Sequence, residues 1–158
     1  MTLSNDRPVA LSAAGRAMLM RFEGLRLVAY TPVAGDVPTI GWGATRYADG
    51  RPVRLGDRCS RADADALLAA TVARDATALV ALLGDTATTQ AQFDALLCLG
   101  YNIGMHALAG STLLAAHRAG QPAAAAGHFA DWRFAGGHAV AGLTARRAAE
   151  AFLYRGQS

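Results

Sequence analysis

The sequence contains no lysine, only two glutamates and only two cysteines. Every one of its 15 basic residues is therefore an arginine, and the formal net charge is +3. These arginines are dispersed along the chain, and the longest basic run is the pair Arg146-Arg147. Dispersed positive charge argues against a dedicated nucleic-acid surface, so we expect no nucleic-acid partner.

Cysteine and histidine are too scattered to suggest a metal site. Cys59 and Cys98 form no C-x-x-C motif, so zinc is not expected and free thiols are favoured over a disulfide. The four histidines are His106, His117, His128 and His138. No two of them are three or four residues apart, which excludes a helical metal-binding pair. We therefore expect neither a metal nor any other cofactor.

Long apolar runs are missing as well. No segment approaches the ~20 uninterrupted apolar residues of a membrane span. Residues 8–20 are apolar, but they include Arg16 and lack the basic flank and small-residue cleavage site of a signal peptide. We therefore expect no membrane insertion and no signal peptide, with synthesis and folding in the cytoplasm.

What remains is a globular composition, 53% hydrophobic and 17% charged over 158 residues, which suits one domain over 1–158. The periodicity predicts an α+β fold. A loose lead-in over 1–10 precedes a helix over 12–23, which Ser12 can cap and Gly24 can stop. A β lobe over about 25–57 follows, and then a helical lobe over about 60–156.

Within the β lobe, short strands at 27–30, 39–43 and 51–55 predict an antiparallel meander. The glycines at 41 and 43 allow close approach of another group to the backbone. In the helical lobe, Ser60 and Asp63 resemble a capping box. Helices are expected there at 60–83, 89–104, 111–119, 122–131 and 143–154.

The two glutamates differ in setting. Glu150 follows Arg146 by four residues on a predicted helix, a spacing that favours a surface ion pair. Glu23 lies at the junction of a predicted helix and a predicted strand. Burial at such a junction disfavours the charged carboxylate, as a general acid requires. A simple ion pair with Arg21 or Arg26 is the alternative, and position alone leaves both open.

Five fragments, found in the same order, closely resemble phage-type lysozymes, glycoside hydrolase family 24. The resemblance covers roughly residues 12–156. The fragments are residues 23–30 with 39–43; 92–96 with 101–104; 111–114; Trp132 with Gly136-Gly137; and Gly142-Leu143 with Arg146-Arg147 and Glu150. Single fragments of this kind are weak, but five in the family's order are a strong signal.

The resemblance implies a lysozyme-like fold, with a small antiparallel β-sheet lobe, a larger helical lobe and a glycan-binding cleft between them. It also implies hydrolysis of the β-1,4 bond between N-acetylmuramic acid and N-acetylglucosamine in bacterial peptidoglycan. Glu23 matches the family's proton donor. An aspartate on the sheet lobe and a threonine position the water or stabilise the cation, the arrangement that oxocarbenium-like chemistry requires.

The sequence departs from its family at the second carboxylate. The usual aspartate is the ninth residue after the glutamate, which is Pro32 in this chain. The family threonine matches Thr39 only with one inserted residue. We take Asp36 as the substitute, aimed by a tight turn at Gly35, although an ordinary turn acid is the alternative. Asp49 is a weaker candidate because Asp-Gly is typical of a hairpin turn.

Four further residues are candidates for substrate binding. Tyr30 and Trp42 flank the sheet and could stack on sugar rings, although aromatic residues on strands more often belong to the core. Gln92 and Asn102 are polar positions on an otherwise apolar helix. Asn102 could bind an acetamido group or cap the helix end, and the two interpretations are about equal.

We therefore expect a phage or prophage endolysin, monomeric, that acts on peptidoglycan strands in the periplasm after release through a separate membrane pore. A lytic transglycosylase is an alternative, because that chemistry works with a single glutamate. A secreted antibacterial effector and an inactive wall-binding module are further alternatives, and the retained Glu23 and Thr39 argue against the last.

Overall fold

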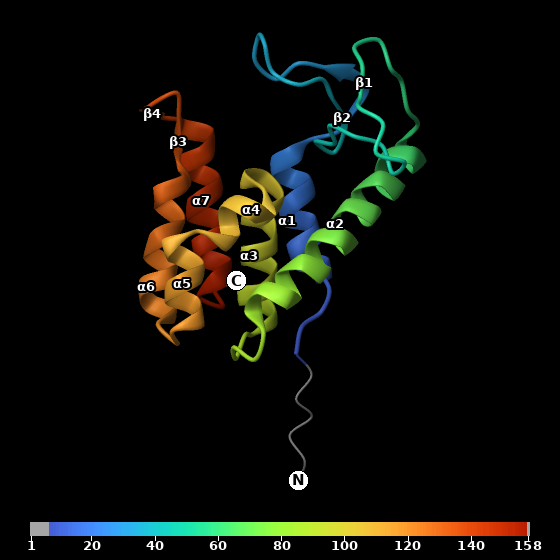
Figure 1. Cartoon of the computed structure of the whole chain (residues 1–158). Coiled ribbons are helices and arrows are strands. Elements are labelled where there is room, and N and C mark those ends of the chain that lie inside the picture. The colour runs from blue at the N-terminus through green and yellow to red at the C-terminus, as the bar shows by residue number, and fades with distance from the viewer. Residues whose placement is uncertain (1–6, 158) are drawn as a thin grey trace. The chain divides into compact units, whose positions relative to one another are not determined.

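The computed structural model describes residues 7–157 (Figure 1). Of the predicted lead-in, residues 1–6 lie outside the described residues, and residues 7–10 form neither helix nor strand. The chain divides into two compact units. One comprises residues 17–74, and the other comprises the chain up to Arg16 together with everything from Asp75 onward.

The unit of residues 17–74 contains a two-stranded antiparallel sheet. Strands β1 (Arg26–Tyr30) and β2 (Thr39–Gly41) pair Arg26 with Gly41 and Tyr30 with Thr39, with an irregularity between these pairs. Ala29 of β1, Ile40 of β2 and Val53 form a buried hydrophobic cluster, and Tyr47, Cys59 and Leu67 pack against it. This cluster joins the two strands to the segment that follows them.

The predicted third strand over 51–55 is wrong. That segment contributes only an isolated bridge between Arg46 and Pro52. Two backbone bonds flank this bridge, from Tyr47 N–H to the Arg51 carbonyl over 2.9 Å and from Val53 N–H to the Thr45 carbonyl over 3.0 Å. The chain turns again directly afterwards, where Asp57 N–H donates to the carbonyl of Arg54 over 3.1 Å.

Helix α2 (Arg61–Leu83) begins at the predicted capping box. Ser60 N–H donates to Asp63 Oδ2, and Asp63 N–H donates to Ser60 Oγ, each over 3.0 Å. The two bonds satisfy donors that the first turn of a helix leaves unpaired. Among residues 7–157, α2 is the one helix long and apolar enough to cross a membrane, judged by length and composition. The charged pair Arg74-Asp75 interrupts its apolar run.

The second unit is helical. Helix α1 (Ala13–Glu23) starts in it, and α3 (Gln90–Ile103) is its most buried element, packed against α7 (Ala141–Tyr154). The other helices are α4 (Met105–Ala109), α5 (Thr112–Arg118), α6 (Pro122–Gly127) and the 3₁₀ helix His128–Trp132. Strands β3 (Phe134–Ala135) and β4 (His138–Ala139) form a hairpin around Gly136-Gly137.

The predicted helix 89–104 is confirmed as α3, with Thr89 and Gly104 as its caps. The short helix α4 that follows was not predicted. The predicted helix 122–131 is instead α6 followed by a 3₁₀ turn. Short tight helices of this kind leave too few turns for a period to be read from sequence.

A buried carboxylate joins the start of α1 to α3. Asp94 is 2% exposed. It accepts from the Ser12 backbone N–H over 3.0 Å, from the Ser12 hydroxyl, and from Gln90 Nε2 over 2.8 Å. Ser12 in turn caps α1 through Gly15 N–H, as predicted. A Cβ on Gly15 would lie 2.7 Å from Asp94 Cγ, so only glycine permits this approach.

Histidine 117 is buried between two hydroxyl groups in the helical unit. Its Nε2 lies 2.9 Å from Thr88 Oγ1, and its Nδ1 lies 2.5 Å from Tyr154 Oη. Burial lowers the pKa of His117 below its ordinary value of 6.5, and burial also raises the pKa of Tyr154 to about 12. A neutral imidazole needs one donor and one acceptor, which two rotatable hydroxyls supply.

We predict that this histidine makes the fold sensitive to mild acid. Because the pKa of His117 is lower in the folded chain than in the unfolded one, stability present above about pH 6.5 declines as the pH falls toward the folded value. The free energy of unfolding, measured by urea titration from pH 7.5 to 5, should fall less steeply in His117→Gln than in the parent. Parallel pH profiles for the two proteins would contradict the assignment.

Candidate active site

Glutamate 23 is the last residue of α1. The helix stops there because Gly24 adopts a φ of +67°, a left-handed conformation that glycine tolerates best, while its N–H bonds the Met20 carbonyl over 3.0 Å. The Glu23 side chain therefore leaves the helix at its end, where the chain turns into β1. The junction predicted from sequence is confirmed.

The Glu23 carboxylate lies directly against the backbone at Gly43. A Cβ placed on Gly43 would be 2.5 Å from Glu23 Oε2, so no other residue fits without moving the carboxylate. Gly43 also has a φ of +89°, which strains any L side chain. The side chain of Glu23 is half-buried in this position. The Glu23 carboxylate therefore occupies the space that a side chain at position 43 would fill.

The loop that supplies Gly43 is itself fixed on α2. A Cβ added at Gly41 would lie 3.2 Å from the Cβ of Ala64, which shows how closely the backbone approaches that helix. Trp42 is 8% exposed, and its Nε1–H donates to Asp65 Oδ1 over 2.7 Å. The Arg61 guanidinium lies 5.5 Å from the centre of the Trp42 ring. Trp42 therefore anchors the loop, which favours the packing interpretation of this residue over stacking on a sugar.

Thr39 and Tyr30 face each other across the two strands. Thr39 is 7% exposed, and its hydroxyl donates to the Val37 carbonyl over 3.1 Å. Tyr30 is half-buried, with the Arg26 guanidinium 4.8 Å from its ring centre. The register thus sets one candidate catalytic residue opposite one candidate substrate-binding residue.

Asp36 lies on an exposed turn outside the strands. Its N–H donates to the Val33 carbonyl over 2.9 Å, and Gly35 has a φ of +90°. The tight turn predicted at Gly35 is therefore present, and no regular strand connects Asp36 to Thr39. Strand alternation consequently does not force the two side chains to opposite faces.

Asp49 occupies a hairpin-like turn. Gly50 N–H donates to the Tyr47 carbonyl, and Asp49 Oδ1 accepts from Arg51 N–H, each over 2.9 Å. Asp49 also pairs with the Arg51 side chain at 3.7 Å. These bonds are those of a turn-forming aspartate, as the sequence indicated.

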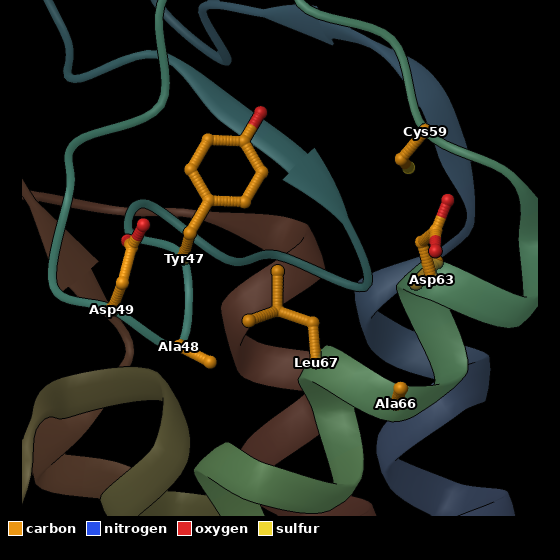
Figure 2. Close-up of a pocket in the computed structure, with 8 residues that line it drawn as sticks. Tyr47, Ala48, Asp49, Cys59, Asp63, Ala66 and Leu67 are labelled. Atoms are coloured by element: carbon orange, nitrogen blue, oxygen red, sulfur yellow. The ribbon is translucent and has the colours of Figure 1, made fainter.

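A cavity of about 370 Å³ in the same unit lies beside this turn (Figure 2). Tyr47, Leu67 and the Cys59 thiol line it, with Asp49 and Asp63 among the polar residues around it. Burial raises the pKa of Cys59, and the carboxylate of Asp63 raises it further. Neither Glu23 nor Thr39 lines this cavity.

The other two predicted binding residues belong to the helical unit. Gln92 completes the capping box of α3, its Oε1 accepting from Thr89 N–H over 2.9 Å. Asn102 is exposed near the end of α3, and its Oδ1 accepts from Arg147 Nη2 over 2.9 Å. The capping bond favours a structural role for Gln92. Asn102 is tied to the helix that follows much later in the chain.

Metal ligation is not supported by the described part of the chain. No group of three or more histidine, cysteine or acidic side chains in residues 7–157 is arranged to hold a metal ion. Cys59 and Cys98 are not joined in a disulfide; the first is half-buried and the second buried.

Comparison with solved structures defines the class. The fold matches an endolysin from Escherichia coli O157:H7 phage FAHEc1 with a TM-score of 0.80 and 38% identity, over 91% of this chain and 92% of that one. It matches the muramidase domain of SpmX from Asticaccaulis excentricus with a TM-score of 0.79 and 33% identity, over 91% and 96%. The predicted α+β, lysozyme-like fold class is thereby confirmed.

The chain belongs to the phage lysozyme family, whose model matches residues 20–150. It is 38% identical to an endolysin of Bacillus phage B103 over 91% of this chain but 53% of that protein. It is 35% identical to an endolysin of Acyrthosiphon pisum secondary endosymbiont phage 1, over 91% and 97%. The chain thus spans about half the length of the first relative and nearly all of the second.

Sequence reasoning missed two features of the structure, one in each unit. The sequence marks Gly43 as a position of close backbone approach but does not name its partner, because a sequence does not show which side chain approaches a glycine. The predicted surface setting of Glu150 is wrong, since Glu150 is 0% exposed and lies between Arg146 and Arg147. The i, i+4 spacing indicated the pair but not its burial.

We predict that Gly43→Ala lowers bacteriolytic activity by about 100-fold, because the new methyl group displaces the Glu23 carboxylate from its place. The measurement is the rate of clearing of a cell-wall suspension. Gly50→Ala is the matched control: Gly50 has a similar φ of +85°, yet a Cβ there meets nothing within 4 Å. Equal losses in the two variants would assign the effect to backbone strain and contradict the proposed contact.

Proposed function

We propose that this chain is a muramidase, cleaving the β-1,4 bond between N-acetylmuramic acid and N-acetylglucosamine in bacterial peptidoglycan. The observation that carries the proposal is the Glu23 carboxylate at the end of α1, set against Gly43. Membership of the phage lysozyme family supports the same chemistry.

In the proposed mechanism, Glu23 protonates the glycosidic oxygen of the leaving sugar. The positive charge that develops on the other sugar requires a carboxylate or an oriented water nearby. We assign these tasks to Asp36 and Thr39. Asp36 replaces the acid that the family places where this chain has Pro32, and Thr39 lies at the start of the adjoining strand.

For substrate contacts we propose Tyr30 and Asn102 as the principal residues. Tyr30 is half-buried and retains ring surface for stacking, while Asn102 is exposed and carries an amide suited to an acetamido group. Trp42 and Gln92 are candidates on sequence grounds. Their bonds to Asp65 and Thr89 give both a role in holding the scaffold.

The biological role that we propose is lysis of a host bacterium by a phage endolysin. The relatives from Bacillus phage B103 and from the aphid endosymbiont phage are named endolysins. We propose that the protein acts as a monomer, is made in the host cytoplasm, and reaches the wall in the periplasm through a pore formed by another protein.

Replacing the acid should slow the reaction strongly. Glu23→Gln is expected to reduce the cleavage rate by about 10²–10⁴-fold while the fold is retained, because the amide cannot donate the required proton. The readout is mass spectrometry of digested peptidoglycan, which in the parent should show reducing ends. Predominantly anhydro-muramic ends would instead establish a transglycosylase. Full activity of Glu23→Gln would exclude Glu23 as the acid.

The second carboxylate is tested by comparing two turn acids. Asp36→Asn should lower the cleavage rate on the order of 100-fold, because it removes the negative charge that stabilises the developing cation on the sugar. Asp49→Asn changes an exposed turn acid in the same unit and should leave the rate within about twofold. Equal rates for the two variants would remove Asp36 from the mechanism.

A further inference from the structure

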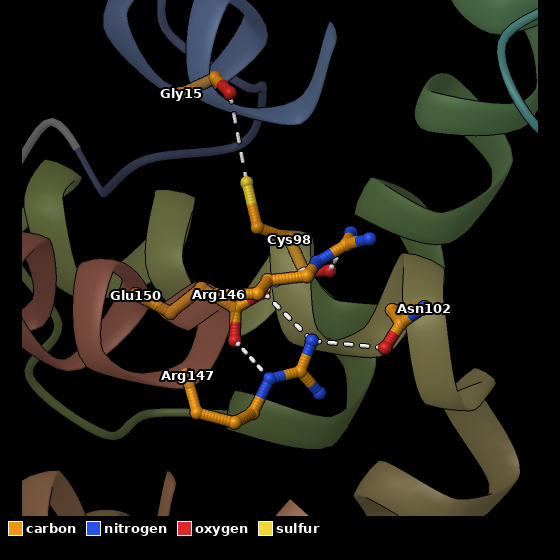
Figure 3. Close-up of polar contacts among 6 residues, drawn as sticks. All are labelled: Gly15, Cys98, Asn102, Arg146, Arg147 and Glu150. Atoms are coloured by element: carbon orange, nitrogen blue, oxygen red, sulfur yellow. Dashed lines mark hydrogen bonds and ion pairs between the residues drawn. The ribbon is translucent and has the colours of Figure 1, made fainter. Parts of the chain in front are cut away.

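The amide of Asn102 is held in one orientation by a cation from another helix. Its Oδ1 accepts from Arg147 Nη2 over 2.9 Å (Figure 3). Asn102 lies near the end of α3, whereas Arg147 lies in the middle of α7. The contact therefore spans 45 residues of sequence, and it forms only when the two helices pack together.

A guanidinium can only donate, so it selects the oxygen of an amide and never the nitrogen. The carbonyl end of Asn102 must then face Arg147, and the NH₂ end must face the other way. Figure 3 shows this arrangement, with the Asn102 nitrogen on the side away from Arg147. Because Asn102 is exposed, its N–H donors remain accessible to a ligand.

Arg147 is itself immobilised by Glu150. The Arg147 side chain is 1% exposed and that of Glu150 is 0% exposed. Arg147 Nε lies 2.9 Å from Glu150 Oε2, and Arg147 Nη2 donates to Glu150 Oε1 over 3.1 Å. Nη2 thus bonds both the carboxylate and Asn102, so the bonds to Glu150 fix the nitrogen that orients the amide.

Arg146 shares the carboxylate but takes a different direction. Its Nε donates to Glu150 Oε1 over 3.1 Å, and its Nη2 donates to the Cys98 carbonyl over 3.4 Å. Figure 3 shows the Arg146 guanidinium near Cys98 and the Arg147 guanidinium reaching toward Asn102. Arg146 therefore matches Arg147 in burial, helix and ion pair, and its described contacts do not include Asn102.

We propose that Arg147, fixed by Glu150, is a positioning residue for substrate recognition that makes Asn102 a hydrogen-bond donor. The group it selects is an acceptor, the carbonyl oxygen of an acetamido substituent on the glycan. This inference rests on the proposed muramidase function. It adds that the donor character of Asn102 is set from α7, and it separates the tasks of two neighbouring arginines.

The test compares Arg147→Lys with Arg146→Lys on a soluble oligosaccharide of alternating N-acetylglucosamine and N-acetylmuramic acid. A lysine retains a charge for Glu150 but has no planar fork to join two acceptors. Arg147→Lys should raise KM by about three- to tenfold, the range for one lost hydrogen bond, with kcat within about twofold. Arg146→Lys should leave KM unchanged. Both substitutions weaken a buried ion pair with Glu150, and the thermal unfolding temperature of each variant measures that common effect on stability.

Two changes at Asn102 keep the test independent of core stability. Asn102→Asp still accepts from Arg147 but presents no N–H, so it should raise KM as much as Asn102→Ala does. In the Asn102→Ala background, Arg147→Lys should then cause no further rise in KM.

The outcomes separate the two proposals. A parent protein that does not cleave the oligosaccharide refutes the muramidase function itself. An active parent with equal KM values for Arg147→Lys and Arg146→Lys, or with normal KM for Asn102→Asp, refutes the positioning role alone.

Discussion

The close approach of the Glu23 carboxylate to Gly43 is the constraint on which the rest of the site depends. It places a carboxylate where a side chain would otherwise lie, and that requires a left-handed glycine at the end of α1 and another after β2. The neighbouring contacts hold the loop that carries Gly43. Gly41 lies against Ala64, and Trp42 bonds Asp65, so the loop carrying Gly43 is fixed on α2 before it reaches the glutamate.

The two proposed carboxylates differ in how firmly they are held. Glu23 is half-buried at a helix end, whereas Asp36 lies on an exposed turn secured by one backbone bond to Val33. A proton donor gains from a defined position and partial burial, because both affect where and when it releases its proton. A carboxylate that stabilises a developing cation acts through charge over a longer distance. Such a role tolerates the displacement from position 32 to position 36 better than proton transfer would.

The helical unit shows how buried charge can serve recognition. Two arginines surround one carboxylate at Glu150, an arrangement whose desolvation cost is large unless the geometry is good. One guanidinium continues to a main-chain carbonyl and the other to Asn102. A buried ion pair adds little to stability compared with apolar packing, but it fixes the orientation of its side chains. In this protein the oriented guanidinium of Arg147 bonds the exposed amide of Asn102.

The sequence by itself determined the elements whose signals are local. Helix periodicity, the Ser12 and Ser60 caps and the helix stop at Gly24 all depend on neighbours within four residues, and so did the identification of Glu23 at a junction. Tertiary structure decided what depends on distant partners. In the folded chain, residues 51–55 form a single bridge in place of a strand. Gly43 lies against the Glu23 carboxylate, and Glu150 is buried between two arginines. The physical reason is that spacing reveals which residues share a face, whereas burial and close approach depend on what packs against that face.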